Sequence, residues 1–298
     1  MPLRTIPEFP IFAEPTLEMK NEVDALLVPL NNGASELSFL NIYLFRHTYH
    51  YTISSKGNML VIKGSYNDES FVITPCRTFY PEVMVQFLNE GFRWSCITEE
   101  FLTENKNVIA QSELKDFVIA EDRNNFDYVY LANSLATLEG KELHKKKTHI
   151  NKFERTYPNL RLLPLKPSTA SDAFKILQQW REGRSEDADY QEAKEVLTFL
   201  DDERFCMKGV VLYVGETAVA WSIAEIFKER KMAVVLFEKA LDKYKGSFQY
   251  INYALALHLK DEVKFINREQ DLGNEGLRQA KMTYRPAFFV KKYTTRIS

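Results

Sequence analysis

A run of polar side chains near the carboxyl end of the chain has the residue types that bind substrates and move protons. The run Asn267–Asp271 directly follows the apolar stretch VKFI and opens the sequence INREQDLGNEGLRQAKMTYRP. Because ligands of open α/β sheets bind at the carboxyl ends of strands, this position favours a substrate site. The alternative is purely structural, since Asn267 or Asp271 can cap a helix that begins near Gly273. Such a helix start also offers N–H groups to an anion.

A carboxylate in an apolar strand is a second candidate for chemistry. Glu225 lies in AWSIAEIF, among residues that otherwise suit a sheet interior. If it is buried, Glu225 can act as a general base. If it points outward, it is an ordinary surface charge, and the sequence leaves both readings open.

The stretch KELHKKKTHINKFER is strongly basic. It has six Lys and Arg side chains against two Glu. At helical spacing, Leu143, Ile150 and Phe153 form an apolar face and the charges lie elsewhere. The charges form either a solvated surface or a patch that binds phosphate from a nucleotide, CoA or a tRNA backbone. No other phosphate motif is present apart from Lys245-Gly246-Ser247 before a predicted helix, and neither GxxxxGK[ST] nor GxGxxG occurs.

Composition excludes several other classes of protein. The five histidines do not have metal-ligand spacing, and the three cysteines lie far apart without a CxxC pair, so we expect no metal site and no disulfide. A net charge of −2 argues against a purely electrostatic nucleic-acid binder. No apolar run reaches the length of a signal peptide or a membrane span. We therefore expect a cytoplasmic protein without a membrane span.

The order of predicted elements indicates a duplicated α+β architecture with mixed sheets. The second half reads α-α-β-β-β-α-β-α-β. The first half has a shorter echo, in which a three-strand meander, beginning in FLNIYLFRHTYHYTISS, precedes the helix FYPEVMVQFLNE. RLLPLKPSTAS is a candidate boundary, which gives domains at 1–160, with an extended N-terminal arm, and 161–298.

Two blocks of the sequence carry a family resemblance. FDYVYLANSLATLEGKELHKKKTHINKFERTYP and INREQDLGNEGLRQAKMTYRPAFFVKKY resemble uncharacterised bacterial proteins related to the C-terminal catalytic domain of phosphatidylglycerol lysyltransferase. The resemblance extends from about residue 37 to residue 293. It implies two tandem GNAT domains, the fold of acyl-CoA N-acyltransferases. It also implies transfer of an aminoacyl group from a charged tRNA to an amine or hydroxyl, without a metal.

The resemblance assigns roles to particular residues. It places a substrate groove at Asn267, Gln270, Asp271, Lys281 and Tyr284. It places a phosphate or tRNA contact surface at Lys146, Lys147 and His149. The family pattern has an Arg-Asn pair where this chain has Lys147-Thr148, and a lysine lacks the bidentate fork of an arginine.

Three functions follow from these observations. The first is an acyl- or aminoacyltransferase for a soluble acceptor, with Glu225 or Asp271 as the base, strand amides stabilising the oxyanion and Lys281 neutralising a phosphate or carboxylate. The second is a CoA-dependent N-acyltransferase on the same scaffold. The third is a non-catalytic small-molecule-binding protein that keeps the fold. No cofactor is expected other than aminoacyl-tRNA or acyl-CoA as the donor substrate.

Overall fold

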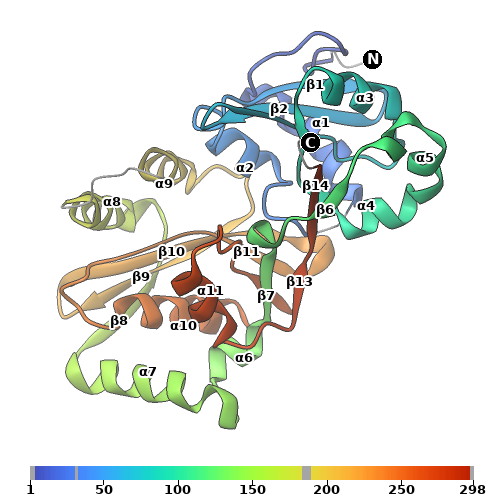
Figure 1. The fold of residues 1–298 in the computed structure, drawn as a ribbon. Coiled ribbons are helices and arrows are strands. Elements are labelled where there is room, and N and C mark those ends of the chain that lie inside the picture. The colour runs from blue at the N-terminus through green and yellow to red at the C-terminus, as the bar shows by residue number, and fades with distance from the viewer. Residues whose placement is uncertain (1–3, 31–32, 183–188, 296–298) are drawn as a thin grey trace. The chain divides into compact units, whose positions relative to one another are not determined.

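The computed structural model describes residues 4–30, 33–182 and 189–295, and its chain forms two compact units (Figure 1). Unit 1 consists of Met1–Asp127, Gln270–Asn274 and Val290–Ser298, and unit 2 of Tyr128–Glu269 and Glu275–Phe289. The chain therefore leaves unit 1 twice and returns to it twice. The boundary predicted at residues 160–161 falls at the start of a strand inside unit 2.

Unit 1 contains two small sheets and five helices. Its helices are α1 (Lys20–Leu27), α2 (Phe39–Leu44), α3 (Pro81–Asn89), α4 (Glu99–Glu104) and α5 (Lys106–Gln111). Its strands are β1 (Thr52–Lys56), β2 (Met59–Tyr66), β3 (Glu69–Ile73), β4 (Arg93–Trp94), β5 (Ile97–Thr98), β6 (Ile119–Glu121) and β14 (Lys292–Thr295). The first sheet has the order β1-β2-β3-β4, and the second has β14 between β5 and β6.

The predicted meander and the helix after it are confirmed. β1, β2 and β3 pair antiparallel through tight turns, and β4 then joins β3 in parallel. Val83, Met84 and Phe87 form the buried face of α3 and pack in one core with Trp94. The N-terminal arm is extended as predicted over its described part, because Phe9 N donates to Ser55 O at 2.9 Å and Ala13 pairs with Ile53.

The start of the meander was predicted wrongly. Phe39–Leu44 forms helix α2, although its aromatic and β-branched residues suggested a strand. Ser38 caps this helix, since its Oγ accepts a hydrogen bond from Asn41 N at 3.1 Å. All but one of the six helical side chains are buried, so tertiary packing outweighs local strand propensity here.

A buried ion cluster connects the distant segments of unit 1. Lys292, at the start of β14, is fully buried and its Nζ lies 2.7 Å from Asp127 Oδ1 and also pairs with Glu36. Ser35 N donates to Asp127 Oδ2 at 2.8 Å, and Gln270 Nε2 donates to Glu36 Oε1 at 2.9 Å. We call these five residues the Lys292 cluster. They bring four chain segments together in a low-dielectric interior, where each charge needs its partners.

Unit 2 has a seven-stranded mixed sheet of order β13-β7-β12-β11-β10-β9-β8. Its strands are β7 (Asp127–Leu131), β8 (Leu160–Pro164), β9 (Met207–Val214), β10 (Thr217–Phe227), β11 (Met232–Ala240), β12 (Phe265–Asn267) and β13 (Phe288–Val290). Its helices are α6 (Ala132–Thr137), α7 (His144–Thr156), α8 (Pro167–Arg181), α9 (Tyr190–Val196), α10 (Ser247–Leu259) and α11 (Glu275–Met282). β7 begins, and β13 ends, with a residue of unit 1.

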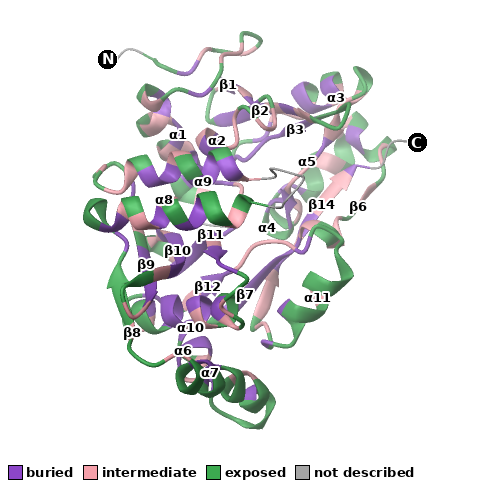
Figure 2. Cartoon of the chain, turned by 90° about the vertical axis from the view of Figure 1, so that its left-hand side faces the viewer, coloured by how far each residue is buried: buried purple, intermediate pink, exposed green. Residues whose placement is uncertain are grey.

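Helices cover both faces of this sheet. α10, α6 and α7 share an apolar core with Tyr130, Ala224 and Val235 on one face, and α8 packs on β10 and β11. Figure 1 shows α8 and α9 on the opposite side of the sheet from α10. In Figure 2, α7 is exposed over most of its surface, which fits its basic composition. No helix within the described residues is long and apolar enough to cross a bilayer.

Replacing the buried lysine should destabilise unit 1. Lys292→Met leaves Asp127 buried without its cation, and we expect the free energy of unfolding to fall by about 3–5 kcal/mol. Urea denaturation measures this change. The neighbouring Lys291→Met is the matched control, because the Lys291 side chain is 39% exposed and pairs with Glu99 at the surface, so the stability of this variant should remain close to wild type. Equal effects of the two substitutions would contradict the role given to Lys292.

The Lys292 cluster should also make stability depend on pH. Burial raises the pKa of Glu36. The positive charge of Lys292 lowers this pKa in part, and the negative charge of Asp127 raises it further. The folded state therefore holds the Glu36 proton more tightly than the unfolded state, and stability from this group declines as pH rises above about 4.5, the ordinary value. Between pH 5 and pH 8, wild type should lose more unfolding free energy than Glu36→Gln. A parallel decline in both proteins would rule this out.

Candidate functional site

Two parallel neighbouring strands of unit 2 separate after a short contact. β11 and β12 pair only from Met232↔Phe265 to Val234↔Asn267, and β11 then continues for six residues to Ala240. Over these six residues, the β12 side of β11 has no strand partner in the described chain. A bulge in the β10–β11 pairing lies at the same level, between Ile223 and Ala224. Bulges bend a strand and occur next to active sites, so this level of the sheet is a candidate place for a ligand.

Asn267 holds the chain where it leaves β12. Its side chain is fully buried, and its Oδ1 accepts a hydrogen bond from Glu269 N at 2.7 Å. Glu269 has φ +55°, and its carbonyl accepts from Tyr128 N at 3.1 Å. Asn267 thus shapes the loop that positions Arg268, and it does not cap the following helix, which begins at Glu275.

Arg268 forms a buried ion pair across the opening. Its guanidinium lies 2.9 Å from Glu238 Oε2, and the two side chains are 15% and 18% exposed. Asn252 of α10 donates to the other oxygen of Glu238 at 3.1 Å. Arg268 Nε is buried and has no hydrogen-bond partner among the described residues. A buried N–H donor without a partner is uncommon and indicates that a ligand group can complete this site.

Two tyrosines and two lysines surround this pair. Lys281 Nζ donates to Arg268 O at 2.7 Å, and Tyr130 Oη donates to Lys281 O at 2.9 Å. Lys146 Nζ lies 4.1 Å from the centre of the Tyr284 ring, and the Arg268 guanidinium carbon lies 5.3 Å from it. These contacts fix one face of α11 and one face of α7 next to the end of β12.

The electrostatics of this group favour an anionic or carbonyl ligand. We call its members the Arg268 cluster: Arg268, Glu238, Asn252, Tyr130, Lys281, Tyr284 and Lys146. Burial raises the pKa of both tyrosines, so they remain hydrogen-bond donors at neutral pH. Burial, and then the charge of Arg268, lowers the pKa of Lys146. The cluster holds three cationic side chains against one carboxylate, which leaves an excess of positive charge.

The structure thus brings together some of the predicted site residues. Lys281, Tyr284 and Lys146 lie in the Arg268 cluster, and Asn267 supports it. Lys147 and His149 lie on α7 with exposed side chains. Among the described residues, no three or more His, Cys, Asp and Glu side chains are grouped as metal ligands.

The two carboxylates proposed as bases lie outside this cluster. Glu225 is half-buried in β10, and it alternates with Ala224 and Ile226, which belong to the core under α10. Its side chain therefore leaves the sheet on the face opposite to that core. Asp271 belongs to unit 1, where its Oδ2 lies 3.2 Å from Arg123 and its Oδ1 accepts from Gly273 N at 2.9 Å. Gln270 also belongs to unit 1, within the Lys292 cluster.

Sequence reasoning missed Glu238, Asn252 and Tyr130. Glu238 lies in β11, Asn252 in α10 and Tyr130 in β7. Because these elements are far apart in the sequence, no spacing rule groups the three residues. The only local signal was the position of Arg268 directly after an apolar strand. Its partner could be found only from the register, which places the end of β12 beside Val234, so that β11 continues past it to Glu238.

Comparison with known proteins identifies the family. The family described as "Phosphatidylglycerol lysyltransferase, C-terminal" matches residues 28–296. The chain belongs to this family. The predicted relationship is therefore confirmed, and so is the predicted α+β fold of GNAT type.

Three individual proteins are also similar to this chain. A conserved protein of unknown function from Bacteroides thetaiotaomicron is 25% identical, with a TM-score of 0.82 over 96% of this chain and 99% of that one. The L-PGS structure from Bacillus licheniformis is 17% identical, with a TM-score of 0.64 over 97% and 93% of the two chains. An uncharacterised protein of Mycoplasmoides gallisepticum is 23% identical over 60% of this chain, and the match spans 58% of that protein.

Disrupting the Arg268–Glu238 pair should show strong coupling. Arg268→Met and Glu238→Met each leave one buried charge without its partner, and each should lower the unfolding free energy by about 3–5 kcal/mol. The double variant removes both charges and should be less destabilised than the sum of the two. Chemical denaturation of the four proteins gives the coupling energy. Additive effects would show that the two side chains do not interact in the folded protein.

Proposed function

We propose that this chain is an acyl- or aminoacyltransferase that moves an activated group to an amine or hydroxyl of a soluble acceptor. The candidate donors are aminoacyl-tRNA and acyl-CoA. Membership of the lysyltransferase family supports acyl or aminoacyl transfer in general. The observation that supports a site is Arg268, which is only 15% exposed and whose Nε–H has no partner among the described residues, beside the part of β11 that lacks a strand partner on its β12 side.

The proposed chemistry uses three properties of this site. Backbone N–H groups on the open edge of β11 bind the carbonyl oxygen of the donor and stabilise the oxyanion that forms during attack. Arg268 and Lys281 supply positive charge for a phosphate or carboxylate of the substrate. The acceptor nitrogen or oxygen forms a bond to the carbonyl carbon, the ester or thioester bond of the donor breaks, and the leaving oxygen or sulfur takes up a proton.

The acceptor must lose a proton during this transfer. Glu225 and Asp271 remain the proposed bases. Both oxygens of Asp271 already contact Arg123 and Gly273, whereas Glu225 is half-buried on the neighbouring strand to β11. Comparing Glu225→Gln with Asp271→Asn in a transfer assay, with folding verified by circular dichroism, separates the two assignments.

The basic helix α7 supports tRNA as the donor carrier. Lys146 joins α7 to the Arg268 cluster through Tyr284, and Lys147 and His149 are exposed on either side of the buried face of the helix. An exposed basic surface that begins next to the site can follow a phosphate backbone. Lys152, in contrast, lies on the outward face of the same helix.

A CoA donor is the second candidate, and one feature of unit 2 favours it. Gly246, with φ +100°, is the N-cap of α10, a 13-residue helix that follows Lys245. A Cβ at this position would lie 3.2 Å from the Phe153 ring, so glycine suits both the turn and the packing. Amides at such a helix start bind pyrophosphate, which CoA carries.

A screen of donors should decide between the two. Aminoacyl-tRNA at a hundred times its Kd should raise apparent stability by about 2.7 kcal/mol, and acyl-CoA should not. Transfer activity should vanish after nuclease treatment. Stabilisation by acyl-CoA and nuclease-resistant activity would favour the second candidate. Binding of neither donor would contradict transfer itself.

The tRNA surface should respond to single charge changes. Lys147→Gln should weaken tRNA binding roughly twofold to fivefold and reduce the salt dependence of Kd by about one phosphate contact. Lys152→Gln is the matched control on the outward face and should have a smaller effect. Filter binding over a series of salt concentrations measures both, and equal effects of the two substitutions would remove Lys147 from the contact surface.

A further inference from the structure

A pocket in unit 1 lies at the carboxyl ends of two parallel strands. β3 and β4 pair in parallel only through Phe71↔Arg93 and Val72↔Trp94. The chain then continues from β3 into residues 74–77 and from β4 towards residues 96–98, and both of these segments line the pocket. All of the lining residues belong to unit 1, so this pocket does not involve the Arg268 cluster.

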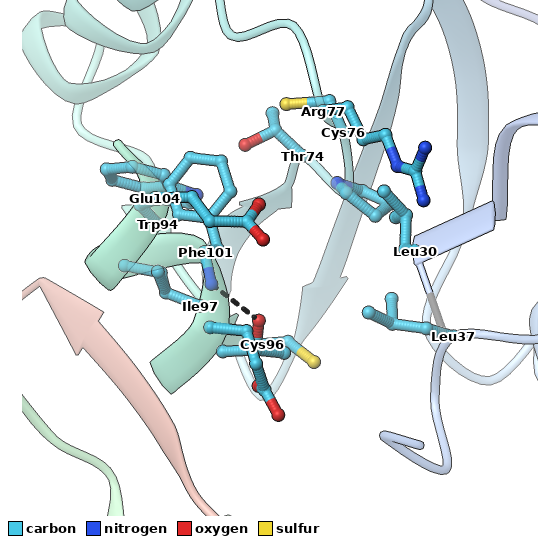
Figure 3. A pocket seen from close by; sticks show the side chains of 13 residues that line it. Leu30, Leu37, Thr74, Cys76, Arg77, Trp94, Cys96, Ile97, Phe101 and Glu104 are labelled. Carbon is cyan, nitrogen blue, oxygen red and sulfur yellow. Dashed lines mark hydrogen bonds between the residues drawn. The ribbon is translucent and has the colours of Figure 1, made fainter. Parts of the chain in front are cut away.

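The pocket is small, and its wall combines apolar side chains with polar and charged ones. Its free volume is about 70 Å³, which is room for roughly five to seven water-sized groups at 10–15 Å³ each. Trp94 and Phe101 form one side of the wall, with ring centres 5.6 Å apart at an interplanar angle of 85°. Leu30 and Leu37 lie on the other side (Figure 3). The apolar part of a small ligand can pack between these side chains, while its polar part faces the remaining wall.

One buried polar atom in the wall lacks a partner. Thr74 is 4% exposed, and its Oγ1 has no hydrogen-bond partner within the described residues. Thr74 lines the pocket directly after β3. A buried hydroxyl without a partner is destabilising, so a ligand or solvent group that reaches this oxygen from the pocket would complete its hydrogen bonding.

The charged side chains that line the pocket indicate whether a ligand with a positive or a negative charge suits it. Two carboxylates, Glu100 and Glu104, and one guanidinium, Arg77, line it, so the lining has an excess of one negative charge. Arg77 already donates to Pro29 O, whereas Glu104 is exposed and forms no ion pair with any described residue. Figure 3 shows Glu104 and Arg77 on opposite sides of the pocket, with Thr74 between them. Glu104 is therefore available to a cation held over the aromatic wall.

The thiols in the wall do not favour covalent chemistry. Burial raises the pKa of Cys76 to about 12, so its thiol stays protonated at neutral pH. Burial also raises the pKa of Cys96 well above its ordinary value. A thiol is a weak nucleophile in this state, and the pocket is suited to reversible binding.

We propose that this pocket is a second ligand site, which binds a small primary amine with an apolar body of about four carbon atoms. The ammonium group pairs with Glu104, Thr74 Oγ1 accepts a hydrogen bond from it, and the carbon chain packs on Trp94. This site does not rest on the proposed transferase function, because its residues and its ligand are independent of the Arg268 cluster.

Fluorine NMR of protein labelled with 5-fluorotryptophan tests the site. The chain has three tryptophans, and only Trp94 lines this pocket. Titration with isobutylamine should shift the Trp94 resonance to saturation and leave those of Trp180 and Trp221 in place. Isobutanol and isobutyrate, which match its shape without the positive charge, should bind at least threefold more weakly.

Variants separate binding from folding. Thr74→Val should weaken isobutylamine binding roughly threefold to tenfold, as expected for the loss of one hydrogen bond, while Thr74→Ser should retain it. Glu104→Gln should weaken binding of the amine and leave binding of isobutanol unchanged. The exposed Thr78→Val and Glu113→Gln serve as controls and should leave the titration unchanged. No saturable shift at Trp94, or equal binding of amine and alcohol, would overturn the proposal.

Discussion

The burial of Lys292 is the constraint that organises unit 1. An ammonium group in a protein interior is tolerated only when carboxylates and further hydrogen bonds surround it. Asp127 and Glu36 supply the carboxylates, and Ser35 and Gln270 bond to these in turn. Because these residues come from four separate segments, the chain cannot satisfy the lysine until all four are in place. This requirement explains how a unit of discontinuous segments is specified.

The polar residues Asn267–Asp271, at the end of β12 and directly after it, form contacts in both units. Asn267 and Arg268 act in unit 2, where the first shapes the loop and the second reaches Glu238. Gln270 and Asp271 act in unit 1, where they contact Glu36 and Arg123. A dense row of polar residues after an apolar strand is thus explained partly by chain routing, since each polar group that becomes buried must find its own partner.

Local patterns were sufficient for most elements but not for the contacts between them. The β9–β10 hairpin around Gly215 and helix α3 follow from alternation and helical periodicity, which are properties of neighbouring residues. Helix α2 was missed because its aromatic residues favour a strand until tertiary burial and the Ser38 cap are considered. The Glu238–Arg268 pair could not be predicted from the sequence for a different reason. It depends on the register between strands, and a residue pattern alone does not fix the register of distant segments.

The two units share a backbone arrangement, but the side chains placed beside it have opposite charge. In each, two parallel strands pair briefly and then separate, β3 from β4 and β11 from β12. Beyond the separation, unit 2 presents Arg268 and lysines, whereas unit 1 presents Glu104 beside Trp94. Since the backbone geometry is shared, the sign of the side chains is what distinguishes the ligands. A donor that carries phosphate or carboxylate suits the first opening, and a small cation suits the second. Such a division would let one fold hold two unlike molecules without competition between them.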